Sequence, residues 1–490
     1  MKRLVRIVFG SLASLLFLCS CTSDHNNETD STQAAVPTEA WVETNNTLDL
    51  CIYHVDTLNP LKTSVKHNAE VLSILYDSLF TAGTDFSANL NLAEQYQISP
   101  DGMTITIKVR QGVRFSNNLP LTAADVAASV NSILTSDGYY KKRFGALKGA
   151  KANGNSVLIT LHHPIDNPAI LLDFPILPNG GNTIDAETQD LFCGSSVYSL
   201  KEYYLNREIH LRANPNHFSG IIPSIESVVI HIVKNQDTAV NMLESSRIDM
   251  MTASAANLQE NTLRKTLQYN MYPDCRFLFL GVNTKDTEFF SFLVYQAVSA
   301  AIDRKQILTE VDIDGVHTAH PIHPDARALD ENNDSSNDSN PHGLLITDGW
   351  TDSDSDGILD KTIAHKKYSL SFHLLVNKDN KSHVLIATLI KDCLAEVGIE
   401  IELTTLPFSR YQHEIGKDSY DFYLAEMDLL PNFDSKDMHS LIHNNFDKGI
   451  PAVIGICFKN ARLLCDSRID ASSIQTLNPY ESICYWSLTE

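Results

Sequence analysis

The sequence predicts a mixed α/β protein built from two or three lobes. Predicted strands and helices alternate along the chain without a fixed repeat period, a pattern typical of mixed α/β lobes. The chain has 490 residues, which is enough for two or three separate hydrophobic cores. Its hydrophobic content of 43% and its charged content of 20% are ordinary for a soluble globular protein.

Local periodicity predicts the individual elements. Residues 47–55 are apolar and β-prone, which predicts a strand, and residues 68–80 show helical periodicity. Residues 104–109 alternate between polar and apolar side chains, with the period of a half-buried strand. A helix is expected to begin after Thr122, the natural N-cap of the apolar stripe that follows. Further strands are predicted near 157–161, 228–233 and 398–407, and further helices at 289–308 and 382–397.

The most specific pattern lies between residues 92 and 126. A Pro-Asp-Gly turn at 100–102 is followed by Val-Arg-Gln-Gly-Val-Arg-Phe at 109–115 and Pro-Leu-Thr-Ala-Ala-Asp-Val at 120–126. The order and spacing of these segments resemble the signature of the family-5 extracellular solute-binding proteins. These are the peptide- and nickel-binding components of bacterial ABC importers. Further matches to the family occur at 194–218 and 296–304, and the resemblance weakens after Met427.

This resemblance implies a two-lobed, periplasmic-binding-protein-like α/β fold of type II with an additional α/β domain. The ligand of such a protein is expected in the cleft between the lobes. By alignment, the first lobe is discontinuous and the extra domain is inserted into it. The expected limits are 47–67, 190–272 and 453–490 for the first lobe, 68–189 for the extra domain and 273–452 for the second lobe.

The N-terminus predicts a lipoprotein. Basic residues within 1–6 precede an apolar run at 7–18 that is too short to span a bilayer. The run ends in a segment that resembles a bacterial lipobox, so we expect residues 1–20 to be a signal peptide and Cys21 to accept the lipid. An ordinary secretory signal is the alternative. The polar segment at 21–46 predicts a flexible tether. The mature protein would then sit on the periplasmic face of a bacterial membrane in the cell envelope, anchored through its lipid only.

Peptide binders of this family resemble a strand-addition device, in which the ligand pairs its main chain with a segment of each lobe. The first-lobe segment is expected at His54, Val55 and Asp56. The second-lobe segment is expected at Ala425, Glu426 and Met427. Backbone pairing binds many sequences, so specificity would be loose.

Two further residues are candidates for ligand contacts. The family usually anchors the α-ammonium group of the peptide on an Asp after this segment, and here either Asp428 or Glu426 could serve. A rim acid without a ligand role is the alternative. Phe408 stands where a family aromatic often walls a side-chain pocket, and simple core packing is its alternative.

Two segments could bind metal ions. His317, His320 and His323 recur at intervals of three, and imidazoles at such spacing could share a transition metal, although the prolines between them favour an extended loop. The alternative is that they are solvated or cleft-lining polar residues. Residues 352–360 look like a calcium loop without the final glutamate, or like a plain acidic turn.

The composition and the missing motifs argue against a nucleic-acid-binding protein and against an enzyme. The formal net charge of −22 disfavours nucleic acid as a partner. The sequence has no GxSxG, HExxH or GxxxxGK[ST] motif, so we expect neither an enzyme nor a cofactor. Beyond Cys21 there are seven cysteines, an odd number, and we expect buried thiols with or without one disulfide.

The sequence therefore predicts a lipid-anchored, monomeric substrate-binding protein that captures short peptides and delivers them to a permease and an ATPase. One alternative is a nickel or metal-chelate binder that uses the three histidines. Another is a surface lipoprotein that has lost transport and acts as an adhesin or sensor.

Overall fold

The computed structural model describes residues 46–54, 57–181, 192–256, 267–283, 290–329, 340–417, 420–434, 436 and 452–489. By its contacts, Thr44–Glu490 forms one unit of the chain, and the elements below belong to it. The predicted signal peptide, Cys21 and nearly all of the tether lie outside the described residues, as do Val55 and Asp56. Within the described ranges, no helix is long and apolar enough to cross a membrane.

The first sheet has four strands in the order β1-β10-β9-β8. Its strands are β1 (Thr47–Tyr53), β8 (Tyr198–Tyr204), β9 (Glu208–Ala213) and β10 (Ser227–Val233). β1 runs parallel to β10, and the other neighbours are antiparallel. The alternate residues Leu48, Leu50 and Ile52 are fully buried, as expected for the predicted strand.

The helical periodicity predicted at 68–80 corresponds to a shorter helix, α1 (Lys66–Leu72), which continues as the 3₁₀ turn η1 (Ser73–Leu75). Asn68 holds α1 against β1, since its side chain accepts a hydrogen bond from Tyr53 N and donates one to Tyr53 O, at 2.9 and 2.8 Å.

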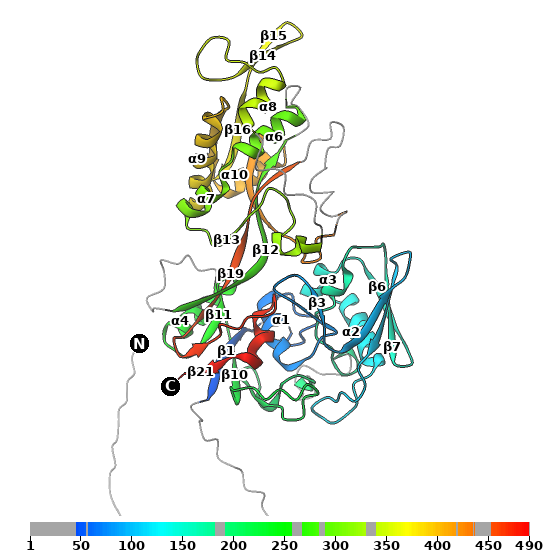
Figure 1. The fold of residues 1–490 in the computed structure, drawn as a ribbon. Coiled ribbons are helices and arrows are strands. Elements are labelled where there is room, and N and C mark those ends of the chain that lie inside the picture. Colours follow the sequence, from blue (N-terminus) through cyan, green and yellow to red (C-terminus); the bar gives the residue numbers. More distant parts are fainter. Residues whose placement is uncertain are drawn as a thin grey trace, which may run out of the picture. The chain divides into compact units, whose positions relative to one another are not determined.

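A second four-stranded sheet is antiparallel, in the order β4-β5-β7-β6, and α2 (Ala123–Leu134) packs on β6 and β7 (Figure 1). Its strands are β4 (Ala93–Ile98), β5 (Thr104–Val109), β6 (Leu147–Asn153) and β7 (Ser156–Leu161). The predicted start of α2 is confirmed, because Thr122 and Asp125 form a capping box. Smaller elements nearby are β2 (Phe80–Ala82), β3 (Ala88–Leu90), α3 (Tyr139–Arg143), η2 (Pro168–Leu171) and η3 (Pro178–Gly181).

The largest sheet follows the order β11-β19-β12-β18-β16-β17, and β13 also pairs with β19. Its strands are β11 (Met250–Thr252), β12 (Gln268–Val282), β13 (Gly315–His317), β16 (Ser371–Asn377), β17 (Glu400–Leu406), β18 (Phe422–Asp428) and β19 (Val453–Cys465). β12 and β19 run antiparallel along most of their length (Figure 1). These two strands contribute side chains to both large hydrophobic cores. The lobe limits that we predict at 272/273 and 452/453 fall within β12 and at the start of β19.

Helices cover the part of this sheet that contains β16 and β18. They are α6 (Phe292–Ala301), α7 (Arg304–Val311), α8 (Pro341–Thr347), α9 (Lys381–Ala395) and α10 (Phe408–Ile415). The continuous helix predicted at 289–308 is wrong, because the chain breaks between Ala301 and Arg304. Asp303 leaves helical geometry to cap α7, where its carboxylate accepts a hydrogen bond from Gln306 N at 2.9 Å. The remaining elements are α4 (Gln236–Glu244), α5 (Ala253–Ala256), η6 (Pro324–Leu329), β14 (Asp360–Ile363), β15 (Lys366–Ser369), β20 (Ile469–Asp470), η8 (Pro479–Tyr485) and β21 (Ser487–Leu488).

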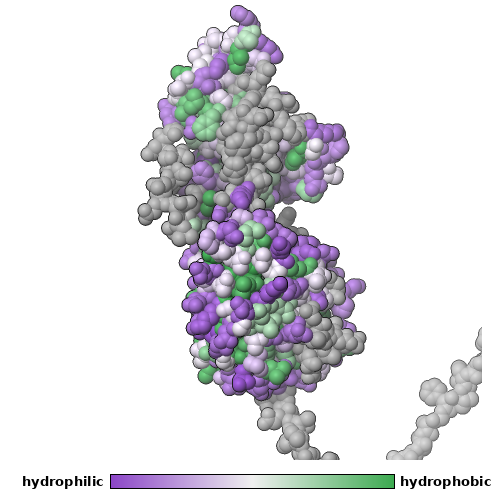
Figure 2. Space-filling view, turned by 90° about the vertical axis from the view of Figure 1, so that its right-hand side faces the viewer, coloured by the Kyte–Doolittle hydropathy of each residue, from purple (hydrophilic) through white to green (hydrophobic). Residues whose placement is uncertain are grey.

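All seven cysteines beyond Cys21 lie in the described residues, and none of the seven forms a disulfide bond there. Four of them, Cys51, Cys275, Cys457 and Cys465, are buried. Burial raises the pKa of these thiols because it disfavours the charged thiolate, to about 12 for Cys51, Cys457 and Cys465. They are therefore structural thiols. On the face seen in Figure 2, hydrophilic residues surround small hydrophobic areas, as expected for an acidic, solvated surface.

Candidate functional site

β18 has a partly open edge. All seven of its residues pair with β12 on one side. On the other side, among the described pairings, only Phe422 and Tyr423 lie in register with β16. The segment Leu424–Asp428, which contains the predicted residues Ala425, Glu426 and Met427, thus extends beyond its second neighbour.

The hydrogen-bond alternation of an antiparallel pair tells which main-chain groups face that open edge. Leu429 N donates to Cys275 O at 2.9 Å, and Asn283 N donates to Asp421 O at 2.8 Å. In this register the odd-numbered residues of β18 direct their N–H and C=O groups toward β12, and the even-numbered residues direct theirs away. The main-chain groups of Glu426 and Asp428 therefore face the open edge.

A pocket of about 640 Å³ lies beside this edge, between the N-terminal turn of α9 and the helix α10. Phe408, whose side chain is exposed, contributes an aromatic wall, and its relative exposure of 50% excludes a role in core packing. The other walls are largely neutral and polar, which suits varied side chains. The pocket is lined by Asn377, Asn380, His383, Phe408, Tyr411, Gln412, Ile415, Gly416, Leu424, Ala425 and Glu426. The structure thus brings three of the predicted residues, Phe408, Ala425 and Glu426, to one pocket.

The carboxylate of Glu426 is already paired. His383 Nε2 lies 2.9 Å from Glu426 Oε1, and Lys459 Nζ forms an ion pair with the same oxygen. Burial raises the pKa of Glu426, but the hydrogen bond from His383 and the charge of Lys459 outweigh this effect and lower the pKa to about 2. Glu426 therefore stays charged at neutral pH with its charge compensated inside the protein. This arrangement disfavours Glu426 as the ammonium anchor.

Asp428 differs from Glu426 in its exposure. Its side chain is 72% exposed and pairs with Arg276 of the adjacent strand, with Arg276 Nε 3.1 Å from Asp428 Oδ1. Exposed ion pairs of this kind are weak, so a ligand cation could compete for the carboxylate. Of the two acids predicted as anchors, Asp428 is the accessible one.

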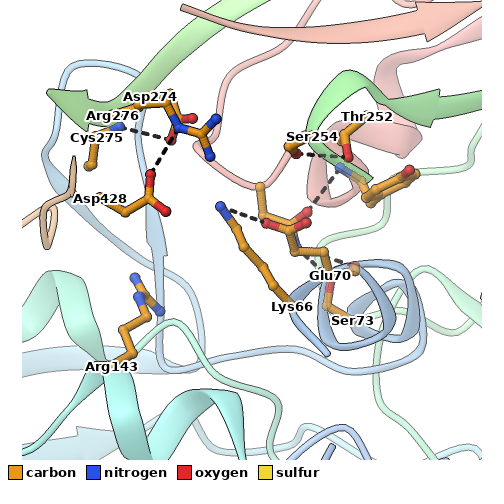
Figure 3. A network of polar contacts seen from close by, with 12 residues as sticks. Lys66, Glu70, Ser73, Arg143, Thr252, Ser254, Asp274, Cys275, Arg276 and Asp428 are labelled. Atoms are coloured by element: carbon orange, nitrogen blue, oxygen red, sulfur yellow. Dashed lines mark hydrogen bonds and ion pairs between the residues drawn. The ribbon is translucent and has the colours of Figure 1, made fainter. Parts of the chain in front are cut away.

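A wider polar network surrounds this ion pair (Figure 3). Cys275 N donates to Asp274 Oδ1 at 2.8 Å, and Lys66 lies 3.5 Å from Glu70 within α1. The guanidinium of Arg143, on α3, points toward Asp428 in this view. Sequence reasoning missed Lys66, Arg143 and Arg276, because no periodicity or spacing relates residues on α1, α3 and β12.

The first-lobe segment is described only in part. His54 has an exposed side chain, and its main-chain N–H donates to Val233 O at 2.6 Å, which extends the pairing of β1 with β10 by one residue. The other two predicted residues, Val55 and Asp56, lie outside the described residues. The expected pairing of this segment with a ligand stays a prediction.

The three histidines do not form a ligand group. His317 lies in β13, whereas His323 is fully buried, with its ring centroid 4.6 Å from that of Phe86 and 5.0 Å from that of Phe458. In the part of the chain that the structure describes, the side chains close enough to share an ion are those of Asp352, Asp354 and Asp356. The structure therefore contradicts the predicted metal site at His317, His320 and His323. Its extended segment separates the imidazoles, and packing against aromatic rings buries the last one.

The acidic loop is stabilised by its own contacts. Asp352 accepts a hydrogen bond from Ser355 N at 2.7 Å, and Lys367 lies 2.6 Å from Asp354 and 3.1 Å from Asp360. The three clustered carboxylates are exposed. Main-chain donors and one lysine thus compensate the acidic charges, which favours the interpretation as a surface turn.

Comparison with known proteins identifies the class. Residues 88–448 match the model of the bacterial extracellular solute-binding proteins, family 5, and the chain belongs to this family. It is 26% identical over 453 residues to the oligopeptide-binding protein AppA of Bacillus subtilis, covering 87% of this chain and 81% of that protein. The expected family resemblance is thereby confirmed.

Solved structures agree with this fold. The structure of Bacillus subtilis AppA in complex with a nonapeptide covers 91% of this chain and 99% of its own, with 21% identity and a TM-score of 0.50. NikZ of Campylobacter jejuni, solved in complex with Ni(L-His), covers 91% of this chain and 100% of its own, with 17% identity and a TM-score of 0.54. The protein thus has the two-lobed α/β fold of the family-5 binding proteins, as predicted.

Proposed function

We propose that the protein is the substrate-binding component of an ABC importer and that it captures short peptides by strand addition to β18. The observation that carries this proposal is the open edge of β18 at Glu426 and Asp428, next to a pocket that contains Phe408. AppA is described as an oligopeptide-binding protein, and its structure holds a nonapeptide, which supports the same ligand class for this chain.

A bound peptide would pair its main chain with the N–H and C=O groups of Glu426 and Asp428. Alternate side chains of the peptide would then enter the pocket between α9 and α10, since successive residues of a strand point to opposite faces. The aromatic wall of Phe408 and the neutral amides of Asn377 and Gln412 suit several side chains. The ligand would favour closure of the two lobes through contacts that only the closed state provides.

Asp428 would anchor the α-ammonium group of the peptide, because it is the exposed acid at the end of the open edge. We expect Asp428→Asn to weaken the binding of a peptide with a free amino group about tenfold, the loss of one charge-assisted hydrogen bond. Binding of the N-acetylated peptide should be unchanged. The matched variant Glu426→Gln should not discriminate between the two ligands, because Glu426 is paired with His383 and Lys459. Isothermal titration calorimetry measures the six affinities, those of the wild type and of both variants for each of the two peptides. An equal loss for both ligands with Asp428→Asn would exclude the anchor role.

The lipid anchor at Cys21 is part of the proposal and rests on the lipobox-like segment and the tether that follows it. The protein would deliver its ligand, as a monomer at the outer surface of the inner membrane or at another envelope membrane, to a permease and an ATPase, and would itself catalyse no reaction. Metabolic labelling with a radioactive fatty acid should mark the wild-type protein and fail to mark Cys21→Ser. Labelling of that variant would exclude the anchor.

A further inference from the structure

One stretch of this acidic protein has no acidic side chain. The chain has 60 acidic and 38 basic residues and a formal net charge of −22, yet no Asp or Glu occurs between Asp137 and Asp166. The basic residues of this stretch are Lys141, Lys142, Arg143, Lys148 and Lys151. The net charge of the whole chain therefore hides a local excess of positive charge.

These basic residues lie on α3 and on β6, two elements that are close together in the chain and in Figure 1. Only residues 144–146 separate the end of α3 from the start of β6. β6 is an edge strand of the second sheet, and α2 packs against it. The side chain of Asn131 on α2 bonds to the N–H and the C=O group of Ala150, both at 3.0 Å. The lysines of β6 are thus carried by a strand that is fixed from both sides.

The basic residues differ in how far the protein already uses their charge. Arg143 donates from both terminal nitrogens to the carboxylate of Asp173, and Lys141 Nζ donates to Leu134 O at 2.9 Å. The remaining three are the exposed residues Lys142, Lys148 and Lys151. None of these three forms an ion pair in the part of the chain that the structure describes. Their charge is therefore available to a partner outside the chain.

We propose that Lys142, Lys148 and Lys151, called the basic patch below, contact an anionic phospholipid bilayer and orient the protein on its membrane. This inference rests on the lipid anchor proposed at Cys21, which keeps a bilayer close to the protein. The polar segment at 21–46 can extend over roughly 90 Å, at about 3.5 Å per residue, so it allows any face of the protein to turn toward the bilayer. The basic patch would then be a second membrane contact besides the lipid.

Charge complementarity favours this face over the others. A lysine close to an anionic membrane surface strengthens binding by roughly fivefold, and three such lysines act together. The acidic side chains elsewhere on the protein are repelled by the same surface. Because salt screens charges beyond about 8 Å at physiological ionic strength, the distant acids do not cancel the attraction at the basic patch. The protein would therefore approach the bilayer with α3 and β6 first.

Co-sedimentation with phospholipid vesicles tests this orientation. The chain from residue 22 onward lacks the signal peptide and the lipid site but contains the whole unit Thr44–Glu490, so it reports on the basic patch alone. We expect it to bind vesicles of phosphatidylglycerol and phosphatidylcholine in equal parts, and not vesicles of pure phosphatidylcholine. Replacing all three lysines of the basic patch by glutamine should weaken this binding about tenfold or more. Raising the salt concentration should weaken the binding of the wild type.

The matched control replaces three dispersed, exposed lysines by glutamine: Lys234, Lys305 and Lys391. This variant loses the same total charge as the first one, so it separates the basic patch from the net charge. It should bind the anionic vesicles like the wild type. The melting temperatures of both variants, expected to match that of the wild type, show that folded proteins are compared.

Three results would overturn the inference. They are an equal loss of binding in the two triple variants, equal binding of the wild type to both kinds of vesicle, and no binding to the anionic vesicles, which would point to an acidic protein as the partner of the basic patch. Because the vesicle assay uses protein without lipid, its failure is distinct from a failure of the anchor, which the labelling of Cys21 reports. Peptide affinity, measured by calorimetry, is independent of both.

Discussion

Glu426 accepts a hydrogen bond from His383 at 2.9 Å, across 43 residues of sequence and from β18 to α9. Lys459 of β19 completes the triad from the other side. These contacts distinguish Glu426 from Asp428, two acids that the sequence leaves as equal candidates for the ammonium anchor. Glu426 lines the pocket with its negative charge compensated by Lys459, whereas Asp428 is the exposed carboxylate at the end of the open edge.

The contacts of Glu426 with His383 and Lys459 should make the free energy of unfolding depend on pH in the acidic range. The folded-state pKa of Glu426, about 2, lies below the ordinary value of 4.5, so its stabilisation is present above pH 4.5 and is lost as the pH falls through 2. The shift corresponds to about 3 kcal/mol at neutral pH, an order-of-magnitude figure. Glu426→Gln should lower the free energy of urea unfolding at pH 7 and reduce its decline toward pH 3. The exposed control Asp428→Asn should leave both nearly unchanged. Wild-type pH dependence in Glu426→Gln would contradict the triad.

Arg304 should be a structural residue. It is buried, and its guanidinium donates to Ser299 O and Gly455 O, both at 2.9 Å, which joins the end of α6 to β19. Burial lowers the pKa of Arg304 to about 10, so the group is charged at neutral pH. Arg304→Met leaves these carbonyls without donors and should cost about 3 kcal/mol or more of unfolding free energy. The exposed neighbour Lys305 provides the control Lys305→Met, for which we expect a change below about 0.5 kcal/mol. Equal stabilities of the two variants would refute this role.

Gly194 should tolerate no side chain. A Cβ atom at this position would overlap the carbonyl oxygen of Leu75, which is main chain and cannot rotate away. Gly194→Ala should therefore lower the unfolding free energy by about 3 kcal/mol or more. Gly145→Ala is the matched control, because a Cβ there meets nothing within 4 Å. Thermal unfolding of both variants decides the point, and a wild-type melting temperature for Gly194→Ala would show that the close approach is not required.

His323 should behave as a core residue. Its ring lies between Phe86 and Phe458 and is fully buried, so His323→Ala should leave a cavity and cost about 2 kcal/mol or more. His317→Ala, at a partly exposed position in β13, should cost less. Ni²⁺ should raise the melting temperature of neither the wild type nor His317→Ala. A nickel-dependent rise that His317→Ala abolishes would restore the histidine metal site.

Patterns of neighbouring residues in the sequence predicted much of the fold. The capping box of Thr122 and Asp125, the strand β1 and the strand β5 depend on neighbouring residues, so periodicity and turn residues were sufficient to place them. The helix predicted at 289–308 was wrong because Asp303 caps a second helix, and a tertiary contact accompanies this local break. Arg304 bonds to Gly455, which is 151 residues away, and this contact accompanies the break after Ala301.

The site was predictable only in outline. The family resemblance placed Phe408 and the Ala425–Met427 segment, and the structure brings Phe408, Ala425 and Glu426 to one pocket. The partners that decide the charge of the site were not predictable. His383 and Lys459 neutralise Glu426 from separate elements, and Arg276 of β12 pairs with Asp428 across 152 residues of sequence.

The central claim is that a peptide adds as a strand to the open edge of β18, and calorimetry with main-chain N-methylated peptides tests it most directly. Methylation removes one N–H donor without changing the side chains. Because only alternate residues of a strand face a given neighbour, methylation at the positions whose N–H groups face β18 should weaken binding about fivefold or more. Methylation at the intervening positions tests the predicted pairing with the first-lobe segment at His54. Affinities that fall at neither set of alternate positions would contradict strand addition.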